Sequence, residues 1–572
     1  MRVLLLAHSF NSLTQRLFVE LRERGHEVFV ELDIADSVTE EAVALARPDV
    51  LVAPFLKRRI PAAVWQRLPC LVVHPGPAGD RGPAALDWAL LEGRTRWGVT
   101  VLQADGEYDA GPVWAEQAFE IAPGATKSAV YRHALADAAL RAVLQALQAI
   151  ERDEKPRQVV PEPLRGPVPA DQRRIDWSRD DAATVLCRVR SADGAPGAKA
   201  WLAGRALRLF DVHPATPHAQ DADTPPGQWM ARRGPAVRVR CADGAVWIGA
   251  VREDEGDGAA PTAGLKLPPT MALPEAAALP EWPQSLWTDE GTAPLDWDEL
   301  RYEEFGPPGA RVGWLAFDVH NGALGERASA RLLAAWREAC SRDTQVLVLA
   351  GGADQFCNGI HLHEIEAAAR RANDSAADAS MRSIEAIDDL ALALIDTTDR
   401  LVVSTLRGNA GAGGCFLALA ADEVWSLPGV VLNPHYRNMG NLHGSEYWTF
   451  LLPRRIGLDA SASLMRGRLP MGAAEALRRG LVDAVLADEA ALRAQAAALA
   501  ADAALPQRIA AKAARRAADE ARRPLAEYRA DELAAMRRNF YGFDPSYHVA
   551  RHHFVHRKPH AWTPRHLATH RR

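Results

Sequence analysis

The chain of 572 residues is too long for one hydrophobic core, so we expect three or four domains. Charged residues make up 24% and hydrophobic residues 48%, which is ordinary for a globular protein, and the net charge of −6 argues against nucleic acid as the main partner. No apolar run is long enough to cross a membrane, and the 6 cysteines form no CxxC pair, so we expect a reduced, cytoplasmic protein without structural zinc.

Residues 1–160 alternate between apolar runs and helix-like segments. RVLLL at 2–6 is typical of a buried strand, and a helix pattern that ends near Gly25 follows it. PDVLVAPF and CLVVHPG predict two more buried strands, and GVTVLQADGEYDAGPVWAEQAF predicts two strands around a polar loop. The alternation predicts a parallel, doubly wound α/β sheet of the Rossmann type.

A histidine stands at the end of one of these strands. His74 follows an apolar run and precedes PGPAGDRGP, a loop rich in proline and glycine. Open α/β sheets place their ligands at the carboxyl ends of strands, although a histidine that only caps the loop is the structural alternative. Asp109 lies in a second polar loop, again after a strand. A carboxylate beside a histidine fixes its tautomer, so the pair is a candidate general acid/base.

Three motifs in this part, VVHPGPAGDRG, WGVT and DAG, resemble the 10-formyltetrahydrofolate-dependent formyltransferases. RRIDWS and GAPGAKAWLAGRALRLFDV resemble the small β-barrel C-terminal domain of that family, and the resemblance covers roughly residues 1–215. It implies that His74 and Asp109 serve in formyl transfer and that 10-formyltetrahydrofolate is the one-carbon donor. It also implies folate contacts at Leu56, Lys57, Arg58, Ala104, Asp105 and Gly106.

One position departs from the formyltransferase pattern. The family has an asparagine two residues before its histidine, where this chain has Val72. That amide would polarise the formyl oxygen, so oxyanion stabilisation must come mainly from His74 and backbone N–H groups. The departure suggests an acceptor other than the usual amine.

The middle of the chain changes character. Residues 161–270 hold short β-like runs with Gly and Pro turns, which predict a small β-barrel domain, and residues 271–300 predict a linker. An α/β pattern then returns, with a helix at about 327–341, and we place a second α/β domain at 301–572, with C-terminal helices and a basic tail. Charges of helical period at 508–536 predict a solvated face, which Pro524 should break or kink.

Two loops of the second α/β domain are candidates for an oxyanion hole. VLVLAGGADQFCNGIHL predicts a strand and a tight turn, and STLRGNAGAGGCFLALAADEVW leads through glycines into an apolar helix. Either loop alone is explained as well by a plain tight turn. Together, in this order, they resemble the crotonase (enoyl-CoA hydratase/isomerase) family over 311–485. The resemblance implies an acyl-CoA thioester ligand and oxyanion donors at Ile360 and Gly413.

The catalytic carboxylates of a hydratase are missing, because the corresponding positions hold Phe416 and the pair Pro434-His435. Hydration of an enoyl-CoA is therefore not expected. Tyr436 and Glu446 instead place polar groups in a largely apolar segment that lines the acyl pocket of the resembled family. They form either a structural hydrogen bond or a proton-transfer pair, since desolvation would raise the pKa of Glu446.

The whole architecture resembles the hydrogenase maturation proteins of the HypX/HoxX type, at HPGPAGDRG, NAGAGG, NPHY and GSEYW. That resemblance implies a bifunctional enzyme that transfers a formyl group to coenzyme A and decarbonylates formyl-CoA to carbon monoxide for a [NiFe]-hydrogenase. Hydrogenase maturation proteins or the hydrogenase large subunit are the implied partners. Two alternatives stay open: a carrier that binds CoA and folate ligands without chemistry, and a formyltransferase or formyl-folate hydrolase with a non-catalytic CoA-binding domain.

The tail that starts at Tyr547 holds seven of the 18 histidines. Their spacing is irregular and no cysteine is near, so we expect no metal site. We interpret the tail as a basic segment that contacts the phosphates of CoA through Arg551, Arg557 and Lys558. A disordered, solvated tail is the alternative.

Overall fold

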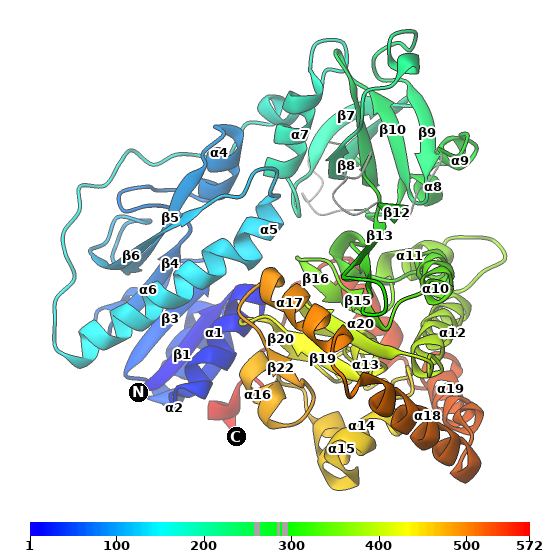
Figure 1. Cartoon of the computed structure of the whole chain (residues 1–572). Coiled ribbons are helices and arrows are strands. Elements are labelled where there is room, and N and C mark those ends of the chain that lie inside the picture. Colours follow the sequence, from blue (N-terminus) through cyan, green and yellow to red (C-terminus); the bar gives the residue numbers. More distant parts are fainter. Residues whose placement is uncertain (257–263, 283–286, 289–295) are drawn as a thin grey trace. The chain divides into compact units, whose positions relative to one another are not determined.

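The computed structural model describes residues 1–256, 264–282, 287–288 and 296–572 (Figure 1). The chain forms two compact units. The first comprises residues 1–264, 268–281 and 558–572, and the second comprises 265–267 and 282–557. The expected α/β multidomain class is confirmed. Among the residues described, no helix is long and apolar enough to cross a membrane.

The first unit opens with a six-stranded sheet in the order β2-β1-β3-β4-β5-β6. Its strands are β1 (Arg2–Ala7), β2 (Glu27–Leu32), β3 (Val50–Phe55), β4 (Cys70–His74), β5 (Arg96–Gln103) and β6 (Val113–Glu120). Strands β1 to β4 are parallel, as expected. The sheet is not parallel throughout, because β5 is antiparallel to β4 and β6 is antiparallel to β5. An antiparallel pair needs only a short connection. Between β5 and β6 this connection is the polar loop that carries Asp109.

Within the described chain, six helices belong to the same part of the sequence as this six-stranded sheet. They are α1 (Ser12–Glu23), α2 (Asp36–Ala46), α3 (Ala62–Trp65), α4 (Ala85–Leu91), α5 (Lys127–Arg132) and α6 (Ala134–Glu151). Helix α1 shows why the sequence folds this way: the side chain of Asn11 caps it by accepting the N–H of Thr14, and Leu13, Leu17 and Leu21 bury one face.

The C-terminal residues complete the same unit. Glu31 on β2 is fully buried, and its carboxylate accepts hydrogen bonds from Thr563 and from Arg571 Nε, the latter at 2.8 Å. His570 Nε2 lies 2.9 Å from the same carboxylate. The end of the tail is therefore ordered on the first sheet, unlike the solvated tail that was the alternative, and it belongs to a different unit from the rest of 301–572.

The β-rich segment forms a five-stranded antiparallel sheet in the order β7-β8-β11-β10-β9. Its elements are η1 (Asp171–Arg173), α7 (Ala182–Ser191), β7 (Ala198–Leu202), β8 (Arg205–Pro214), η2 (Ala219–Asp221), β9 (Trp229–Arg233), β10 (Ala236–Arg240) and β11 (Ala245–Glu253). The expected linker 271–300 is partly folded, because α8 (Pro269–Ala272) and α9 (Pro274–Ala277) place Leu273 and Ala276 in the core of this sheet. Residues 283–286 and 289–295 of that segment lie outside the described residues.

The second unit contains a seven-stranded sheet, β12-β13-β14-β15-β17-β19-β22, and a four-stranded sheet, β16-β18-β20-β21. The strands are β12 (Trp287–Thr288), β13 (Leu300–Phe305), β14 (Val312–Phe317), β15 (Val346–Ala350), β16 (Gln355–Cys357), β17 (Leu401–Leu406), β18 (Asn409–Gly411), β19 (Glu423–Ser426), β20 (Val431–Asn433), β21 (Met471–Gly472) and β22 (Ala484–Val485). The run β14-β15-β17-β19-β22 is parallel, as the returning α/β pattern predicts.

Helices alternate with the strands of the second unit. They are η3 (His320–Gly322), α10 (Glu326–Cys340), α11 (Leu362–Ala368), α12 (Ala376–Ile395), α13 (Gly413–Leu419), α14 (Trp448–Ile456), α15 (Leu458–Arg466), α16 (Ala473–Arg478), α17 (Glu489–Ala500), α18 (Leu505–Arg522), α19 (Leu525–Tyr541) and α20 (Ser546–Val555), and η4 (Thr569–Arg571) belongs to the tail. Helix α10 matches the helix expected at about 327–341. Pro524 separates α18 from α19, as predicted, because it cannot continue a helix.

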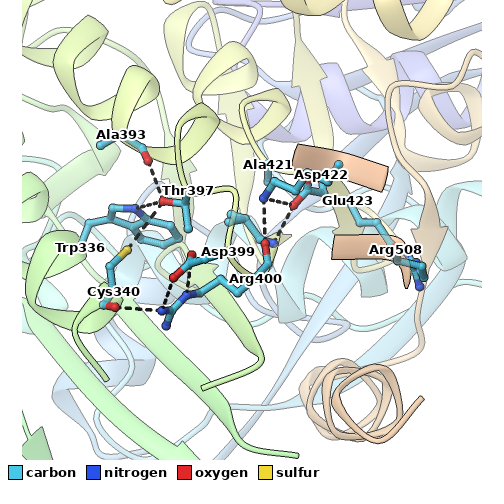
Figure 2. Close-up of polar contacts among 12 residues, drawn as sticks. Trp336, Cys340, Ala393, Thr397, Asp399, Arg400, Ala421, Asp422, Glu423 and Arg508 are labelled. Carbon is cyan, nitrogen blue, oxygen red and sulfur yellow. Dashed lines mark hydrogen bonds and ion pairs between the residues drawn. The ribbon is translucent and has the colours of Figure 1, made fainter. Parts of the chain in front are cut away.

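Polar contacts fix the start of β17, the strand that leads to the glycine-rich loop (Figure 2). Arg400 donates to the carbonyl of Cys340 at the end of α10, at 2.9 Å. Lys512 of α18 donates to the carbonyl of Arg400 at 2.9 Å and to Asp422 at 2.6 Å. Lys512 is buried, which corrects the expectation of a solvated charged face over 508–536 at this position.

Candidate active sites

His74 ends β4, and only 3% of its surface is exposed. Its Nε2 lies 2.7 Å from Oδ2 of Asp80, and its Nδ1 lies 3.6 Å from Oδ1 of Asp109. The structure thus brings together the expected pair of His74 and Asp109. Asp80 makes the shorter contact and was not expected. One carboxylate faces each ring nitrogen, so the orientation of the imidazole is fixed.

A glycine makes the contact between His74 and Asp80 possible. A Cβ on Gly76 would lie 2.2 Å from Oδ2 of Asp80 and 2.6 Å from Nε2 of His74. Thr100 on β5 donates to the carbonyl of Gly76 at 2.8 Å and holds this backbone in place. A side chain at position 76 would therefore push Asp80 and His74 apart, and only a glycine leaves room for both.

Asp109 is held by the backbone of the loop that follows β4. It adopts a left-handed conformation with φ of 53°, and its Oδ2 accepts the N–H of Gly82 at 3.1 Å. Val72 lies two residues before His74 on β4, so both side chains point to the same face. The valine offers no hydrogen-bond donor there, and the donors left for a formyl oxygen are the histidine and backbone N–H groups.

The two loops that were expected to hold folate lie side by side. Leu56 and Ala104 pack against the same apolar cluster. The guanidinium of Arg59 lies 4.1 Å from the ring centroid of Tyr108, and it donates to the carbonyl of Gly106 at 3.4 Å. These contacts bring residues from both predicted loops to one place beside the sheet.

The remaining predicted folate residues make local contacts. The N–H of Lys57 contacts Asp33 at 3.4 Å, and Arg58 forms a surface ion pair with Asp36 at 2.8 Å. Asp105 accepts the N–H of Glu107 at 2.8 Å and so shapes the second loop. A role for these residues in folate binding stays a prediction.

The two expected oxyanion loops meet in the second unit. Ile360 lies between β16 and α11, and Gly413 is the first residue of α13. A Cβ on Gly359, which has φ of 80°, would lie 3.5 Å from the backbone N of Gly413. Within the described residues, the N–H groups of Ile360 and Gly413 donate no backbone hydrogen bond. Two free N–H groups on adjoining loops are the arrangement that an oxyanion hole requires.

Tyr436 and Glu446 form a buried hydrogen-bonded pair beside these loops. The hydroxyl of Tyr436 donates to the carboxylate of Glu446 and contacts the carbonyl of Ser445 at 3.1 Å. Exposure is 6% for Tyr436 and 2% for Glu446, so neither group has more than marginal access to bulk water. A Cβ on Gly413 would lie 2.4 Å from Oε1 of Glu446, which places the carboxylate directly against the oxyanion loop.

The backbone around Glu446 is strained and held by two other buried carboxyl groups. Glu446 and Tyr447 both adopt left-handed conformations, with φ of 63° and 57°. Asp388 of α12 accepts the N–H of Glu446 at 2.7 Å. Glu532 of α19 accepts the N–H groups of Tyr447 and Thr449 at 2.9 and 2.8 Å. Both carboxyl groups are fully buried, which corrects the expectation of a solvated face at Glu532.

Three buried carboxyl groups so close together cannot all ionise freely. Burial raises the pKa of Glu446 to about 7, although the hydrogen bond from Tyr436 lowers it. Burial and the charges of Glu446 and Glu532 raise the pKa of Asp388 well above its usual value. Burial raises the pKa of Glu532 to about 8, and burial and the charge of Glu446 raise that of Tyr436. A carboxyl group with a pKa near 7 can accept a proton at neutral pH.

The positions that carry the catalytic carboxylates in a hydratase hold other side chains here. Phe416 on α13 stacks on Tyr436, with the ring centroids 5.4 Å apart and the planes 12° from parallel. His435 is buried directly before the tyrosine. The stacked ring of Phe416 therefore helps to fix the orientation of the Tyr436 ring.

The three residues expected to contact CoA differ in burial, and they do not all belong to the same unit. Arg551 is buried, donates to Glu366 at 3.0 Å and contacts His548 at 2.8 Å, so a phosphate would have to displace a carboxylate. Arg557 and Lys558 are exposed, and Lys558 belongs to the first unit. The CoA contacts of all three stay predictions.

A cavity of about 410 Å³ adjoins the segment that carries Tyr436 and Glu446. Its lining includes Arg437, Arg466 and Arg538. Three guanidinium groups around one cavity favour an anionic ligand. The sequence does not reveal this cavity, because its lining comes from α14, α15, α19 and the loop before α14.

Three family models match the chain. "Formyl transferase" matches residues 16–147, "Formyl transferase, C-terminal domain" matches 167–263, and "Enoyl-CoA hydratase/isomerase" matches 318–565. The formyltransferase-like and crotonase-like domains expected from the sequence are thereby confirmed.

Full-length similarity extends across all these domains. The hydrogenase maturation factor HoxX of Bradyrhizobium diazoefficiens is 54% identical, over 100% of this chain and 97% of that protein. The crystal structure of HypX from Aquifex aeolicus in complex with tetrahydrofolic acid is 40% identical with a TM-score of 0.92, and the match covers 100% of this chain and 99% of that chain. A methionyl-tRNA formyltransferase of Variovorax paradoxus is 30% identical over 37% of this chain and 66% of that protein.

Proposed function

The chain belongs to the hydrogenase maturation factors of the HypX/HoxX type, and on that premise we propose that it makes carbon monoxide in two steps. In the first step a formyl group passes from 10-formyltetrahydrofolate to the thiol of coenzyme A. In the second step formyl-CoA is decarbonylated to carbon monoxide and CoA. The formyltransferase-like domain supports the first step, and the buried pair of Tyr436 and Glu446 in the crotonase-like domain supports the second.

The first step requires a proton relay. The CoA sulfur bonds to the formyl carbon, the bond between that carbon and the folate nitrogen breaks, and the thiol proton ends on that nitrogen. His74 is positioned to carry the proton, with Asp80 and Asp109 fixing its ring. The tetrahydrofolate in the Aquifex relative supports a folate site in this chain. The adjoining loops with Leu56 and Ala104 offer an apolar face for a pterin.

The second step requires a base and a proton donor in a site without water. Glu446 takes the formyl proton, and the electron pair of the broken C–H bond stays on carbon as the lone pair of carbon monoxide, while an oxygen lone pair forms the third carbon–oxygen bond. The C–S bond breaks with its electrons on sulfur, and Tyr436 gives the sulfur a proton that Glu446 then replaces. Carbon monoxide and CoA are the only products, so no oxidant or reductant is needed. The N–H groups of Ile360 and Gly413 hold the thioester oxygen, which the close approach of Gly359 to the backbone of Gly413 supports.

The observation that carries this proposal is the contact between Glu446, Tyr436 and the backbone of Gly413. A buried carboxyl group with a pKa of about 7 beside an oxyanion loop is poised for proton abstraction. The hydratase positions hold no carboxylate, which supports a reaction other than hydration. The product would serve as the CO ligand of a [NiFe]-hydrogenase, and we propose the hydrogenase large subunit or other maturation proteins as the recipients.

Separate assays of the two steps test the proposal. Wild type, Glu446→Gln and Tyr436→Phe are each given formyl-CoA, and carbon monoxide is trapped on a reduced haem protein. Release of tetrahydrofolate from 10-formyltetrahydrofolate is followed in parallel, with and without CoA. Loss of the general base should slow carbon monoxide release about 10²- to 10⁴-fold. CoA-dependent release of tetrahydrofolate should persist in both variants.

Glu527→Gln is the matched control, because Glu527 is an exposed glutamate on α19. It should make carbon monoxide at the wild-type rate. Wild-type carbon monoxide release by Glu446→Gln would contradict the assigned base. Release of tetrahydrofolate that needs no CoA would contradict the assigned formyl acceptor.

A further inference from the structure

Two neighbouring helices of the second unit bring two histidines and a carboxylate together. Glu366 lies on α11, and His552 and His556 lie one turn apart at the end of α20. Oε1 of Glu366 is 3.4 Å from Nδ1 of His552 and 3.1 Å from Nε2 of His556. All three donor atoms lie within 4.8 Å of one another. One carboxylate oxygen thus faces two imidazole nitrogens.

The two separations from Oε1 of Glu366 match those between ligands around one tetrahedral zinc ion. Zinc bonds of about 2.0–2.1 Å at the tetrahedral angle place two donor atoms about 3.3 Å apart. The two observed separations, 3.1 and 3.4 Å, lie on either side of that value. The two imidazole nitrogens favour zinc or another first-row transition metal over magnesium or calcium, and zinc also accepts a carboxylate oxygen.

The other carboxylate oxygen is held by a separate chain of hydrogen bonds. Oε2 of Glu366 accepts from Nε of Arg551 at 3.0 Å. Nη1 of Arg551 contacts Nδ1 of His548 at 2.8 Å, and Nε2 of His548 contacts the carbonyl of Phe540 at 2.9 Å. Such outer contacts orient a metal-ligating carboxylate and are typical of built metal sites. They leave Oε1 aimed at the two histidines.

We propose that Glu366, His552 and His556 bind one divalent first-row metal ion, with zinc as the preferred ion and water as its fourth ligand. The ion would fasten α20 to α11, and α11 begins just after the predicted oxyanion residue Ile360. The site lies outside the contacts of Tyr436 and Glu446 and takes no part in the proposed reaction. It also differs from the sequence expectation, which foresaw no metal site.

Metal titration of the untagged, full-length chain tests the site. After treatment with a chelator, Zn²⁺ binding is measured by calorimetry, and Co²⁺ is added separately as a spectroscopic probe of four-coordinate geometry. Wild type should bind one more Zn²⁺ per chain than His552→Ala or His556→Ala. The affinity of that site should fall about a hundredfold or more in each variant, since even outer contacts are worth 10- to 100-fold. Zn²⁺ should also raise the unfolding midpoint of wild type but not of these two variants.

His553→Ala is the matched control, because His553 is an exposed histidine on the same helix that is not part of the cluster. It should keep the wild-type stoichiometry and the Co²⁺ spectrum. Circular dichroism checks that each variant is folded. The proposal is overturned if wild type and His552→Ala bind Zn²⁺ with the same stoichiometry and affinity. It is equally overturned if the histidine variants lose no more binding than the control.

Discussion

Replacing Tyr436 by Phe removes the hydroxyl that donates to Glu446 and leaves the ring stacked on Phe416. The hydrogen bond stabilises the ionised carboxylate, and it is one of the contacts that lower the pKa of Glu446 against the larger effect of burial. Its removal must therefore raise that pKa further above its present value of about 7. The carboxylate would then be the minority form at neutral pH.

The magnitude follows from the strength of a hydrogen bond to a charged group. Such bonds contribute about 1.5–3 kcal/mol, and a difference of about 1.4 kcal/mol between protonation states changes a pKa by one. We therefore expect the pKa of Glu446 to rise to about 8–9 in Tyr436→Phe. Infrared titration of the protonated carboxyl band measures this directly, without any need for activity. Glu446→Gln identifies the band by its disappearance.

Tyr447→Phe provides the matched control, because Tyr447 is an adjacent, equally buried tyrosine. Its hydroxyl has no hydrogen-bond partner among the described residues. The control should leave the Glu446 band titrating near pH 7. An unchanged or lowered pKa in Tyr436→Phe would refute the reasoning, because it would mean that the hydroxyl does not stabilise the carboxylate.

Three further outcomes are expected. Gly413→Ala should abolish most carbon monoxide release, because its Cβ would lie 2.4 Å from Oε1 of Glu446, and it should spare formyl transfer; Gly166→Ala, where the space is open, should leave both reactions at the wild-type rate. Asp80→Asn should slow tetrahydrofolate release more than Asp109→Asn, since its contact with the histidine is 2.7 Å and not 3.6 Å; the reverse order would contradict the geometry. Glu532 binds its proton more tightly in the folded chain than in the unfolded one, so it lowers stability progressively as the pH rises from about 4.5 to about 8. In denaturant unfolding, the free energy of unfolding of Glu532→Gln should rise relative to that of wild type over this pH range. A difference between the two free energies that does not change with pH would exclude this effect.

The positions of the candidate site residues could be predicted from the sequence where they depend on local motifs. His74 and Asp109 each follow a strand, and Ile360 and Gly413 each sit in a glycine-containing loop. Strand ends and tight loops bring such residues together in any sheet of this topology. In the structure His74 lies near Asp109, and the loops that carry Ile360 and Gly413 adjoin; the roles of these residues stay predictions.

The supporting residues could not be predicted in the same way. Glu532 lies among charges of helical period, and that pattern indicates a solvated face unless the helix packs against a polar backbone. Its burial results from the left-handed turn at Glu446 and Tyr447, whose N–H groups need acceptors. Asp388 on α12 meets the same need from a different part of the chain. The contact of Asp80 with His74 could not be predicted either, because it depends on how the loop after β4 turns back at Gly76.

The most direct test of the proposed two-step synthesis follows the formyl carbon. Wild-type protein is incubated with ¹³C-formyl-labelled 10-formyltetrahydrofolate and reduced haem protein, with and without CoA, and the isotope in the haem-bound gas is measured. We expect ¹³CO that requires both the folate and CoA and that Glu446→Gln no longer releases. Labelled formate in place of ¹³CO, or ¹³CO formed equally without CoA, would contradict the synthesis of carbon monoxide by way of formyl-CoA.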